Sequence, residues 1–364
     1  MSLNSKESKI LSLINKTPMI TNKEIAKKLN ISQLSVMFYI SKLQKRGKIV
    51  GRKYITRKSD YVCVIGGSNI DITGYPEGNF NQKDSNPGKI KTSLGGVARN
   101  IAENLSRLGI NVELVTVLGT DGYARDIRSS CIENSMNIMH SQIIPGFNTS
   151  VYICINDKYG EMQCAISDME IYKYMTPKFI MSKLEIINNA IALVVDTNVP
   201  TDALEFIINN VTVPIFMDTV SVKKAEKVKD IIKNIHTIKP NILEAEVLSG
   251  IQINNSQDLE TAAKIIISKG VKNLYISMGQ NGAYYADEFI SGIVPCLPVN
   301  VVNTSGAGDA FLASTVWAYI NNMDIVQSAR AGTAAASVCA SSNLNVSPDI
   351  SVQRIKNILK SEWR

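Results

Sequence analysis

The chain has 364 residues, of which 45% are hydrophobic and 20% are charged, and its formal net charge is +7. This length exceeds one ordinary domain, and the composition is typical of a globular protein with an ample core and excludes a disordered chain. No apolar run approaches the ~20 residues that cross a bilayer, and the first residues lack the apolar core of a signal peptide. Six scattered cysteines predict neither a zinc site nor a disulfide framework, as in a cytoplasmic protein.

The charge is divided unevenly along the chain. Residues 1–58, which we call the head, hold 14 lysines and arginines against two acids, a net charge of +12. Residues 59–364, which we call the body, carry 25 basic and 30 acidic residues, a net charge of −5. A basic head on a mildly acidic body indicates two domains with different partners.

The head is predicted to form three short helices followed by a hairpin. Thr21 can cap the second helix, and Glu24 three residues later completes a capping box. Ser32 can cap the third helix, which stops at Gly47. The stretch KIVGRKYIT, 48–56, alternates like two short strands. Over roughly the first sixty residues this pattern resembles the winged helix-turn-helix modules of bacterial regulators.

The resemblance implies that the segment from Ser32 to Lys45 is a DNA-recognition helix. Its early polar side chains would then face base edges, and nearby basic side chains would contact phosphates. The residues predicted to contact DNA are Gln33, Ser35, Lys42, Lys45, Arg46, Arg52 and Lys53. The alternative is a basic three-helix unit used for dimerisation or docking, since lysine-rich surfaces are common in chains of this composition.

From Tyr61 onward, apolar strands alternate with amphipathic helices, which predicts an α/β fold with a doubly wound, mainly parallel sheet flanked by helices. The predicted helical stretches include 97–108, 202–210, 257–269 and 309–321. Two alternating runs, SVYICIND and MQCAISD, break the pattern and predict a hairpin that can close over a ligand as a small β lid. We expect the lid strands within about 68–95 and 150–168.

Polar residues follow the first buried strand of the body, in IGGSNID. Ligands of open α/β sheets gather at the carboxyl ends of strands, and the side chains of Asn69 and Asp71 suit the paired hydroxyls of a sugar. An Asx-type turn is the simpler interpretation of this stretch alone. Further along, Gly95 and Gly96 allow close backbone approach before a helix, and Asn100 one turn later can reach back toward whatever they hold.

The stretch NTSGAGDAF, 303–311, lies between a strand-like and a helix-like run. Gly306, Ala307 and Gly308 place successive backbone N–H groups near the start of a helix, where an anion is favoured. Asp309 could simply cap that helix. Beside a transferred phosphoryl group, however, a carboxylate is what a kinase needs to accept the proton of the acceptor hydroxyl.

The stretches GGVARNIAENLSRLG, followed by Gly119, and NTSGAGDAF lie about two hundred residues apart. Together they resemble the two signatures of the ribokinase-like (PfkB) family of carbohydrate and nucleoside kinases, over roughly 60–355. The resemblance implies phosphorylation of a hydroxymethyl group by ATP. It also implies that Asp309 is the catalytic base and that residues 306–308 form the anion hole.

The same resemblance assigns the nucleotide side of the site. In KPNILEAEVLSG, Asn241 and Glu244 match the NxxE element of the family, which helps to position Mg²⁺ and its waters. SMGQNG resembles the nucleotide loop of the family. The implied nucleotide-binding residues are Asn241, Ser277, Gly279, Gly282 and Thr304.

A narrower resemblance, to bacterial pseudouridine kinases, is carried by DSNPGKI, PGFNTSVY, GEMQCAISDM, DTVSVKKAEKVKD, IHTIKPNILEAEVLSGI and SMGQNGAYY. These enzymes phosphorylate the 5′-hydroxyl of pseudouridine, so that a separate glycosidase can cleave the C–C glycosidic bond. The resemblance implies that the ribose is held by Asn69, Asp71, Gly95, Gly96, Asn100 and Asn198. It implies that the base is read by Thr149, Asp168 and the loop 84–89.

Three functions are left open by the sequence. The first is a nucleoside 5′-kinase acting on pseudouridine, the second a kinase for another nucleoside or a ribose-type sugar, and the third a nucleoside-sensing transcription regulator with weak catalysis. The expected cofactors are ATP and Mg²⁺, and the expected partners are DNA and a second copy of the chain, with no membrane. Asn303 replaces an aspartate that helps many relatives to hold a monovalent cation, so potassium activation is left open.

Overall fold

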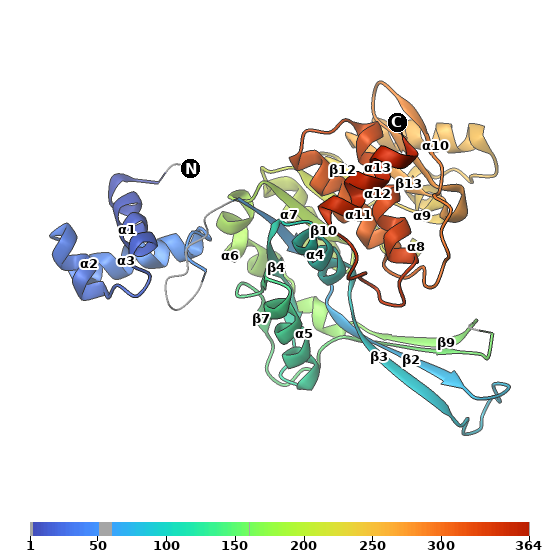
Figure 1. Ribbon diagram of the computed structural model, residues 1–364, viewed down its shortest axis with the longest axis horizontal. Helices are drawn as coiled ribbons and strands as arrows, with labels where there is room; N and C mark the ends of the chain where they lie inside the picture. The colour runs from blue at the N-terminus through green and yellow to red at the C-terminus, as the bar shows by residue number, and fades with distance from the viewer. Residues whose placement is uncertain (1–2, 51–59, 160, 364) are drawn as a thin grey trace.

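The computed structural model describes residues 3–50, 60–159 and 161–363. Figure 1 shows the small helical head, in blue, beside the larger α/β body. The head comprises α1 (Ser5–Lys16), α2 (Asn22–Leu29) and α3 (Gln33–Lys45). The predicted wing at 48–56 falls mostly outside the described residues, and Arg52 and Lys53 lie there as well.

The head helices begin where their capping residues predict. The Thr21 side chain accepts a hydrogen bond from the Glu24 N–H, and Glu24 Oε2 accepts one from the Thr21 N–H at 2.7 Å, so the predicted capping box is confirmed. Ser32 caps α3 as predicted. The three helices pack around a small core to which α1 contributes Ile10 and Ile14.

The body is built on a nine-stranded sheet with the order β15-β14-β13-β12-β11-β10-β1-β4-β6. The strands are β1 (Tyr61–Ile65), β4 (Asn111–Val115), β6 (Met136–Asn137), β10 (Ala192–Asp196), β11 (Ile215–Asp218), β12 (Thr237–Lys239), β13 (Asn273–Ser277), β14 (Ala283–Ala286) and β15 (Ser291–Val294). Pairing is parallel from β6 to β13, whereas β14 and β15 are antiparallel additions at one edge. The predicted mainly parallel sheet is confirmed.

Helices cover both faces of this sheet. They are α4 (Val97–Arg107), α5 (Gly122–Glu133), α6 (Pro177–Asn188), α7 (Thr201–Asn210), α8 (Val222–Ala225), α9 (Ile242–Ser249), α10 (Ser256–Ser268), α11 (Ala307–Ile320), α12 (Ile325–Ala340) and α13 (Val352–Glu362), with short 3₁₀ turns η1 (Glu170–Tyr174) and η2 (Gly279–Asn281). Alternate residues of β1 enter opposite cores: Cys63 and Ile65 pack with α6 and α7, while Val62 and Val64 pack with α4 and α11. The fold is therefore doubly wound.

The lid is a separate four-stranded sheet with the order β3-β2-β8-β9. Its strands are β2 (Asn69–Pro76), β3 (Gly88–Gly95), β8 (Val151–Asn156) and β9 (Met162–Asp168). Strands β8 and β9 pair antiparallel and form the predicted hairpin. Figure 1 shows these strands extending away from the body. Strands β5 (Val117–Leu118) and β7 (Gln142–Ile143) form a small third sheet near the base of the lid.

The head meets the body through a buried guanidinium. Arg46, only 7% exposed, donates from Nη1 to Glu7 Oε2 of α1 at 2.9 Å and from Nε to Glu185 Oε1 of α6 at 2.7 Å. Lys42 is also paired, with its Nζ 3.1 Å from Glu7 Oε1. The expectation that Arg46 contacts a DNA phosphate is therefore not met, because its donors are turned inward to the two carboxylates.

Arg46→Ala is expected to lower the free energy of unfolding of the head by about 3 kcal/mol, because it leaves the buried Glu7 carboxylate with a weakened set of partners. Thermal unfolding of the full chain by calorimetry measures the effect. Lys9→Ala, which removes an exposed cation from α1, is the matched control and should leave the transition unchanged. Equal transitions for the two variants would show that this ion-pair network contributes nothing to the junction.

Candidate active site

Four charged side chains meet at the carboxyl ends of the central strands. Asp196 ends β10, Asp218 ends β11 and Lys239 ends β12, while Asp309 lies in the first turn of α11. The Nζ of Lys239 is 3.1 Å from Asp218 Oδ2. This edge is where doubly wound sheets bind their ligands.

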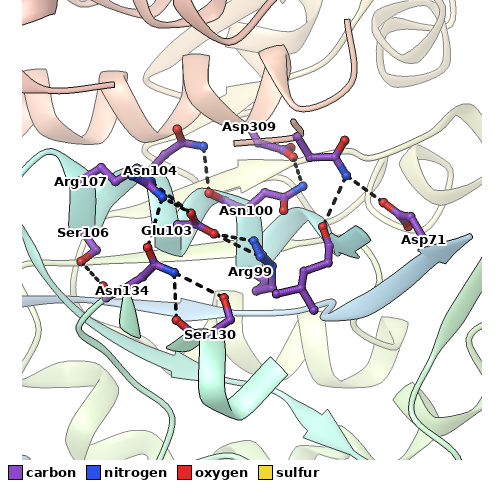
Figure 2. Close-up of polar contacts among 12 residues, drawn as sticks. Asp71, Arg99, Asn100, Glu103, Asn104, Ser106, Arg107, Ser130, Asn134 and Asp309 are labelled. Atoms are coloured by element: carbon purple, nitrogen blue, oxygen red, sulfur yellow. Dashed lines mark hydrogen bonds and ion pairs between the residues drawn. The ribbon is translucent and has the colours of Figure 1, made fainter. Parts of the chain in front are cut away.

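Asp309 is buried, at 8% exposure, and accepts a hydrogen bond on Oδ2 from the Asn100 side-chain amide at 2.8 Å (Figure 2). Burial raises the pKa of Asp309 to about 7, and the negative charge of Asp218 adds to this rise, whereas Asn100 and Lys239 oppose it. A carboxylate that titrates near neutrality suits general-base chemistry.

The turn before α11 is shaped by Gly306. Its φ of 80° lies in the left-handed region, and a Cβ at this position would overlap the carbonyl oxygen of Asn345. The helix starts at Ala307, so Asp309 is its third residue and does not cap it. The N–H of Ala307 donates to the Thr304 carbonyl at 3.3 Å. The other first-turn amides of a helix have no partners within the helix, so this turn can still receive an anion.

Lys239 is a site residue that the sequence patterns did not predict. It is 6% exposed, and its Nζ lies 3.0 Å from the position that a Cβ on Gly308 would take. Burial works to lower the pKa of Lys239, but the carboxylates of Asp218, Glu244 and Asp309 outweigh it and raise the pKa. The one signal in the sequence is that this lysine ends the short segment Thr237–Lys239, which forms β12. The structure thus places a buried cation against the glycine turn.

Asp71 is held from both sides. Its Oδ1 accepts a hydrogen bond from the Asn69 amide at 2.6 Å, and its Oδ2 accepts one from the Asn345 amide at 3.0 Å. Burial raises the pKa of Asp71, and these two donors oppose that rise. Gly95 pairs with Asn69 across β2 and β3, and a Cβ there would overlap the Asp71 carboxylate. Asn345, in the loop after α12, carried no signal in the sequence.

The helix that carries Asn100 begins at a constrained turn. Gly96 has φ of 96°, and a Cβ there would overlap the Gly67 carbonyl after β1. Asp196 fixes both segments, because its Oδ2 accepts from the N–H groups of Gly67 and Ala98, each at 2.9 Å. The structure therefore uses Asp196 to position the start of α4.

Asn198 and Thr149 are both held by other side chains. The Oδ1 of Asn198 accepts a hydrogen bond from Lys224 Nζ beyond the end of β10. Thr149 is buried, and its Oγ1 donates to Asp121 Oδ1 at 2.8 Å and accepts from the Gly119 N–H at 3.0 Å. The Thr149 hydroxyl thus fixes the base of the lid, which does not fit the expectation that it reads a nucleobase.

Asp168 lies on the wrong face of the lid for the role expected of it. It pairs with Val151, which in turn pairs with Ile70, so these three residues share one face. Asp71, the next residue along β2, points to the other face. The loop 84–89 lies largely at the far tip of the β2–β3 hairpin. The expectation that Asp168 meets the same ligand as Asp71 is therefore not met.

Two cavities flank the segment 303–308. A cavity of about 510 Å³ lies under the lid, between Asp71, Tyr152 and Asn156 on the lid side and Asn303, Ser305 and Asn345 on the body side. A second, of about 500 Å³, is lined by Ser277, Gly279, Gly282, Thr304, Ala307, Gly308 and apolar side chains of α11 and α12. One segment of chain thus forms a wall of both cavities, and Asp309 follows it directly.

Asn241 and Glu244 form a capping box at the start of α9. Glu244 Oε2 accepts from the Asn241 N–H at 2.9 Å and from the Thr219 hydroxyl at 2.6 Å, and Oε1 accepts from the Asn241 amide at 2.8 Å. Asn241 also forms an isolated bridge with Ser277, whose side chain borders the second cavity. Within residues 3–50, 60–159 and 161–363, no group of three or more His, Cys, Asp or Glu side chains could hold a metal ion.

Comparison with known protein families identifies both parts of the chain. A family model described as pfkB family carbohydrate kinase matches residues 59–349. The chain belongs to the pfkB family of carbohydrate kinases. A second model, described as winged helix-turn-helix DNA-binding, matches residues 3–50. The resemblances to both families are therefore confirmed, and the protein is a phosphotransferase with an alcohol group as acceptor.

Individual relatives agree with this membership in the pfkB family. The pseudouridine kinase of Escherichia coli K12 is 38% identical over 307 residues, covering 84% of this chain and 98% of that protein. An uncharacterized sugar kinase of the same organism, YeiI, is 31% identical over 98% of this chain and 99% of its own length. The solved Arabidopsis thaliana ribokinase, complexed with ribose and ATP, has a TM-score of 0.75 at 20% identity, covering 83% of this chain and 99% of its own. That structure confirms the ribokinase-like fold.

In the described part of this chain, no helix is long and apolar enough to cross a membrane.

Proposed function

We propose that the protein transfers the γ-phosphoryl group of ATP to the 5′-hydroxyl of pseudouridine in the cytoplasm. The observation that carries the proposal is the position of Asp309 directly after the wall shared by two cavities, one for each substrate. The similarity to the Escherichia coli pseudouridine kinase supports the choice of nucleoside. Six free cysteines suit a reducing cytoplasm.

The ribose would be held beside Asp309 in part by two groups that lack partners of their own. The Oδ1 of Asn100 and the Oγ of Ser68 are buried and have no hydrogen-bond partner among the described residues. Ribose hydroxyls can satisfy both atoms, and the Asp71 carboxylate can accept a further hydroxyl. We assign ribose binding to Asn69, Asp71, Gly95, Gly96, Asn100 and Asn198.

The chemistry would be carried by Asp309. Its carboxylate accepts the proton of the 5′-hydroxyl as that oxygen bonds to the γ-phosphorus, and the bond from this phosphorus to the bridging oxygen of ADP breaks. The N–H groups of 306–308 and the ammonium of Lys239 would offset negative charge on the transferred group. Closure of the lid would exclude water from the reaction.

The cavity beside α11 fits a nucleotide. Thr333 Oγ1 lines it, is buried and has no hydrogen-bond partner among the described residues, so it is available to a ligand. We assign nucleotide binding to Asn241, Ser277, Gly279, Gly282 and Thr304. Both Glu244 oxygens already accept hydrogen bonds, so Glu244 would act on Mg²⁺ through water. Bound Mg²⁺ would neutralise the phosphate charge.

The activity should rise with pH. Because Asp309 must be ionised to accept a proton and its pKa is about 7, kcat/KM should increase about tenfold per pH unit below pH 7 and level off above it. Initial rates with saturating ATP between about pH 5.5 and pH 8.5 measure the profile, after a check that the protein survives each pH. A flat profile with chemistry as the slow step would exclude Asp309 as the base.

The choice of substrate is tested by measuring ADP release with a panel of nucleosides and free sugars. We expect pseudouridine to be phosphorylated with a higher kcat/KM than uridine, other nucleosides or free ribose. A preference for ribose or another nucleoside would overturn the choice of substrate while leaving the kinase reaction intact. No turnover with any member would favour the third function, a nucleoside sensor with weak catalysis.

We also propose that residues 1–58 are a DNA-binding domain and residues 59–364 the kinase domain. The winged helix-turn-helix match and the basic charge of the head support this assignment. Gel-shift binding to DNA upstream of the protein's own coding region, with and without nucleoside, tests it. Absence of binding at low salt would leave the head without a role in regulation.

We also propose that two copies of the chain form a homodimer through their lids. Ile90, Ile153 and Ile166 are exposed on the face of the lid that also carries Asp168. A second copy would cover this apolar surface. Light scattering measures the molecular mass of the wild type and of Ile166→Lys. If both proteins were monomers, the homodimer would be excluded.

The monovalent cation is the remaining question. Asn303 Oδ1 already accepts the Ser305 N–H at 3.0 Å, so we expect little activation by potassium.

A further inference from the structure

The outward face of α3 is apolar. Leu34 is 78% exposed and Phe38 is 64% exposed, one turn apart, and Met37 beside them is 54% exposed. The buried residues of the same helix, Val36 and Ile40, lie on the opposite face, together with Leu43. Three large apolar side chains at i, i+3 and i+4 therefore form one patch, the α3 patch, that the head does not use for its own core.

The surroundings of the α3 patch indicate a polyanion as its partner. Residues 3–50 carry ten lysines and arginines and two glutamates. Although Glu7 neutralises Lys42 and Arg46 in part, Lys45 is exposed two turns after Phe38 on the same face of α3. Two such heads would repel each other, so a second copy is a poorer fit than nucleic acid.

The polar residues expected to read bases do not dominate this face. The Ser35 hydroxyl is 2.9 Å from the Ser32 hydroxyl, within the cap of α3, and Ser35 is half-buried. Gln33 is exposed at the first position of the helix. The centre of the outward face is instead Leu34 and Phe38, so direct readout would depend mainly on apolar contact.

In the major groove, the apolar feature that distinguishes base pairs is the C5-methyl group of thymine. We propose that Leu34, Met37 and Phe38 recognise thymine methyl groups, so that the head selects duplex DNA with thymines at the contacted positions. This inference rests on the proposed DNA-binding function of the head. Lys45 would contribute a phosphate contact that does not depend on sequence.

The test begins with the full chain and a pool of random duplexes, from which the tightest binders are selected and sequenced. Each thymine of the selected site is then replaced by deoxyuridine, which removes the methyl group and keeps the base pairing. We expect affinity to fall about fourfold for each contacted thymine, as measured by fluorescence anisotropy. Replacement of thymines outside the contacted positions should have no effect.

Variants connect the effect to the α3 patch. Leu34→Ala and Phe38→Ala should weaken binding to the thymine duplex and reduce its advantage over the uracil duplex. Met19→Ala removes another exposed apolar side chain, outside α3, and should change neither value. Lys45→Ala should weaken both duplexes equally and lower the salt dependence of binding. Because the substituted side chains are exposed, circular dichroism should show an unchanged head.

Each outcome decides a different point. No binding to any duplex at low salt would remove the DNA-binding proposal itself. Tight binding with equal affinity for thymine and uracil duplexes would overturn the α3 inference alone. A change of oligomeric mass in Leu34→Ala or Phe38→Ala would show that a second copy covers the α3 patch, and would also overturn it.

Discussion

Asp309→Asn is expected to lower kcat by about 100-fold to 10,000-fold with little change in nucleoside affinity. The amide oxygen of the variant can still accept the hydrogen bond from Asn100, so the geometry at the start of α11 is retained. What is lost is a carboxylate that can accept a proton near pH 7. Steady-state ADP release gives kcat, and isothermal titration gives the dissociation constant of the nucleoside.

The matched control is Asp126→Asn, which removes the same charge from an exposed position on α5. It should retain the kcat of the wild type. Near-normal turnover in Asp309→Asn would contradict the assignment of the base, even if the substrate panel confirms a kinase. A large loss of nucleoside affinity instead would indicate that Asp309 mainly binds the acceptor.

Local sequence patterns were sufficient for those parts of the site that depend on local backbone geometry. The glycines before α4 and α11 were recognisable because positive φ values and close backbone approach require glycine, and the structure shows both conditions at Gly96 and Gly306. The position of Asn100 one turn into α4 was predictable from helix periodicity alone. The four predicted helices of the body also appear, with ends displaced by no more than two residues.

The parts that were missed depend on contacts between distant segments. Asn345 reaches Asp71 across 274 positions of the chain, and no local pattern announces that pairing. Glu103 and Arg107 have the i,i+4 spacing of an ordinary surface pair, yet Glu103 is buried. Figure 2 shows that its carboxylate also pairs with Arg99. Such burial follows from how α4 packs in the body, which the sequence of α4 does not reveal.

The head shows the same limit. Arg46 has the spacing and charge of a phosphate contact, but its role is decided by Glu185, which lies 139 positions away. The exposed position of Leu34 and Phe38 could be derived from helix periodicity once Val36 and Ile40 were assigned to the core. The polar residues Gln33 and Ser35 at the start of α3 give no indication of that apolar face.

Lys239→Met is expected to move the rise of kcat/KM to higher pH and to lower the free energy of unfolding by about 3–5 kcal/mol. The cation lowers the pKa of Asp309, so its removal raises that pKa further and leaves less ionised base at pH 7. Below the plateau, kcat/KM at a given pH falls about tenfold for each unit by which the pKa of Asp309 rises. The substitution also leaves the buried Asp218 carboxylate without its partner at 3.1 Å. The pH–rate profile and chemical denaturation measure the two effects separately.

A double variant distinguishes a charge effect from loss of packing. Asp218→Asn combined with Lys239→Met removes both members of the buried pair, so Asp218 no longer leaves a charge without its partner, and it also removes a carboxylate that raises the pKa of Asp309. The double variant should therefore be more stable than Lys239→Met alone, and its pH profile should return toward that of the wild type. Lys264→Met, in an exposed pair with Glu260, is the control for loss of a lysine and should alter neither. The single and double variants could instead be equally unstable and share one pH profile. Lys239 would then contribute through the packing of its side chain, and its charge would not set the pKa of Asp309.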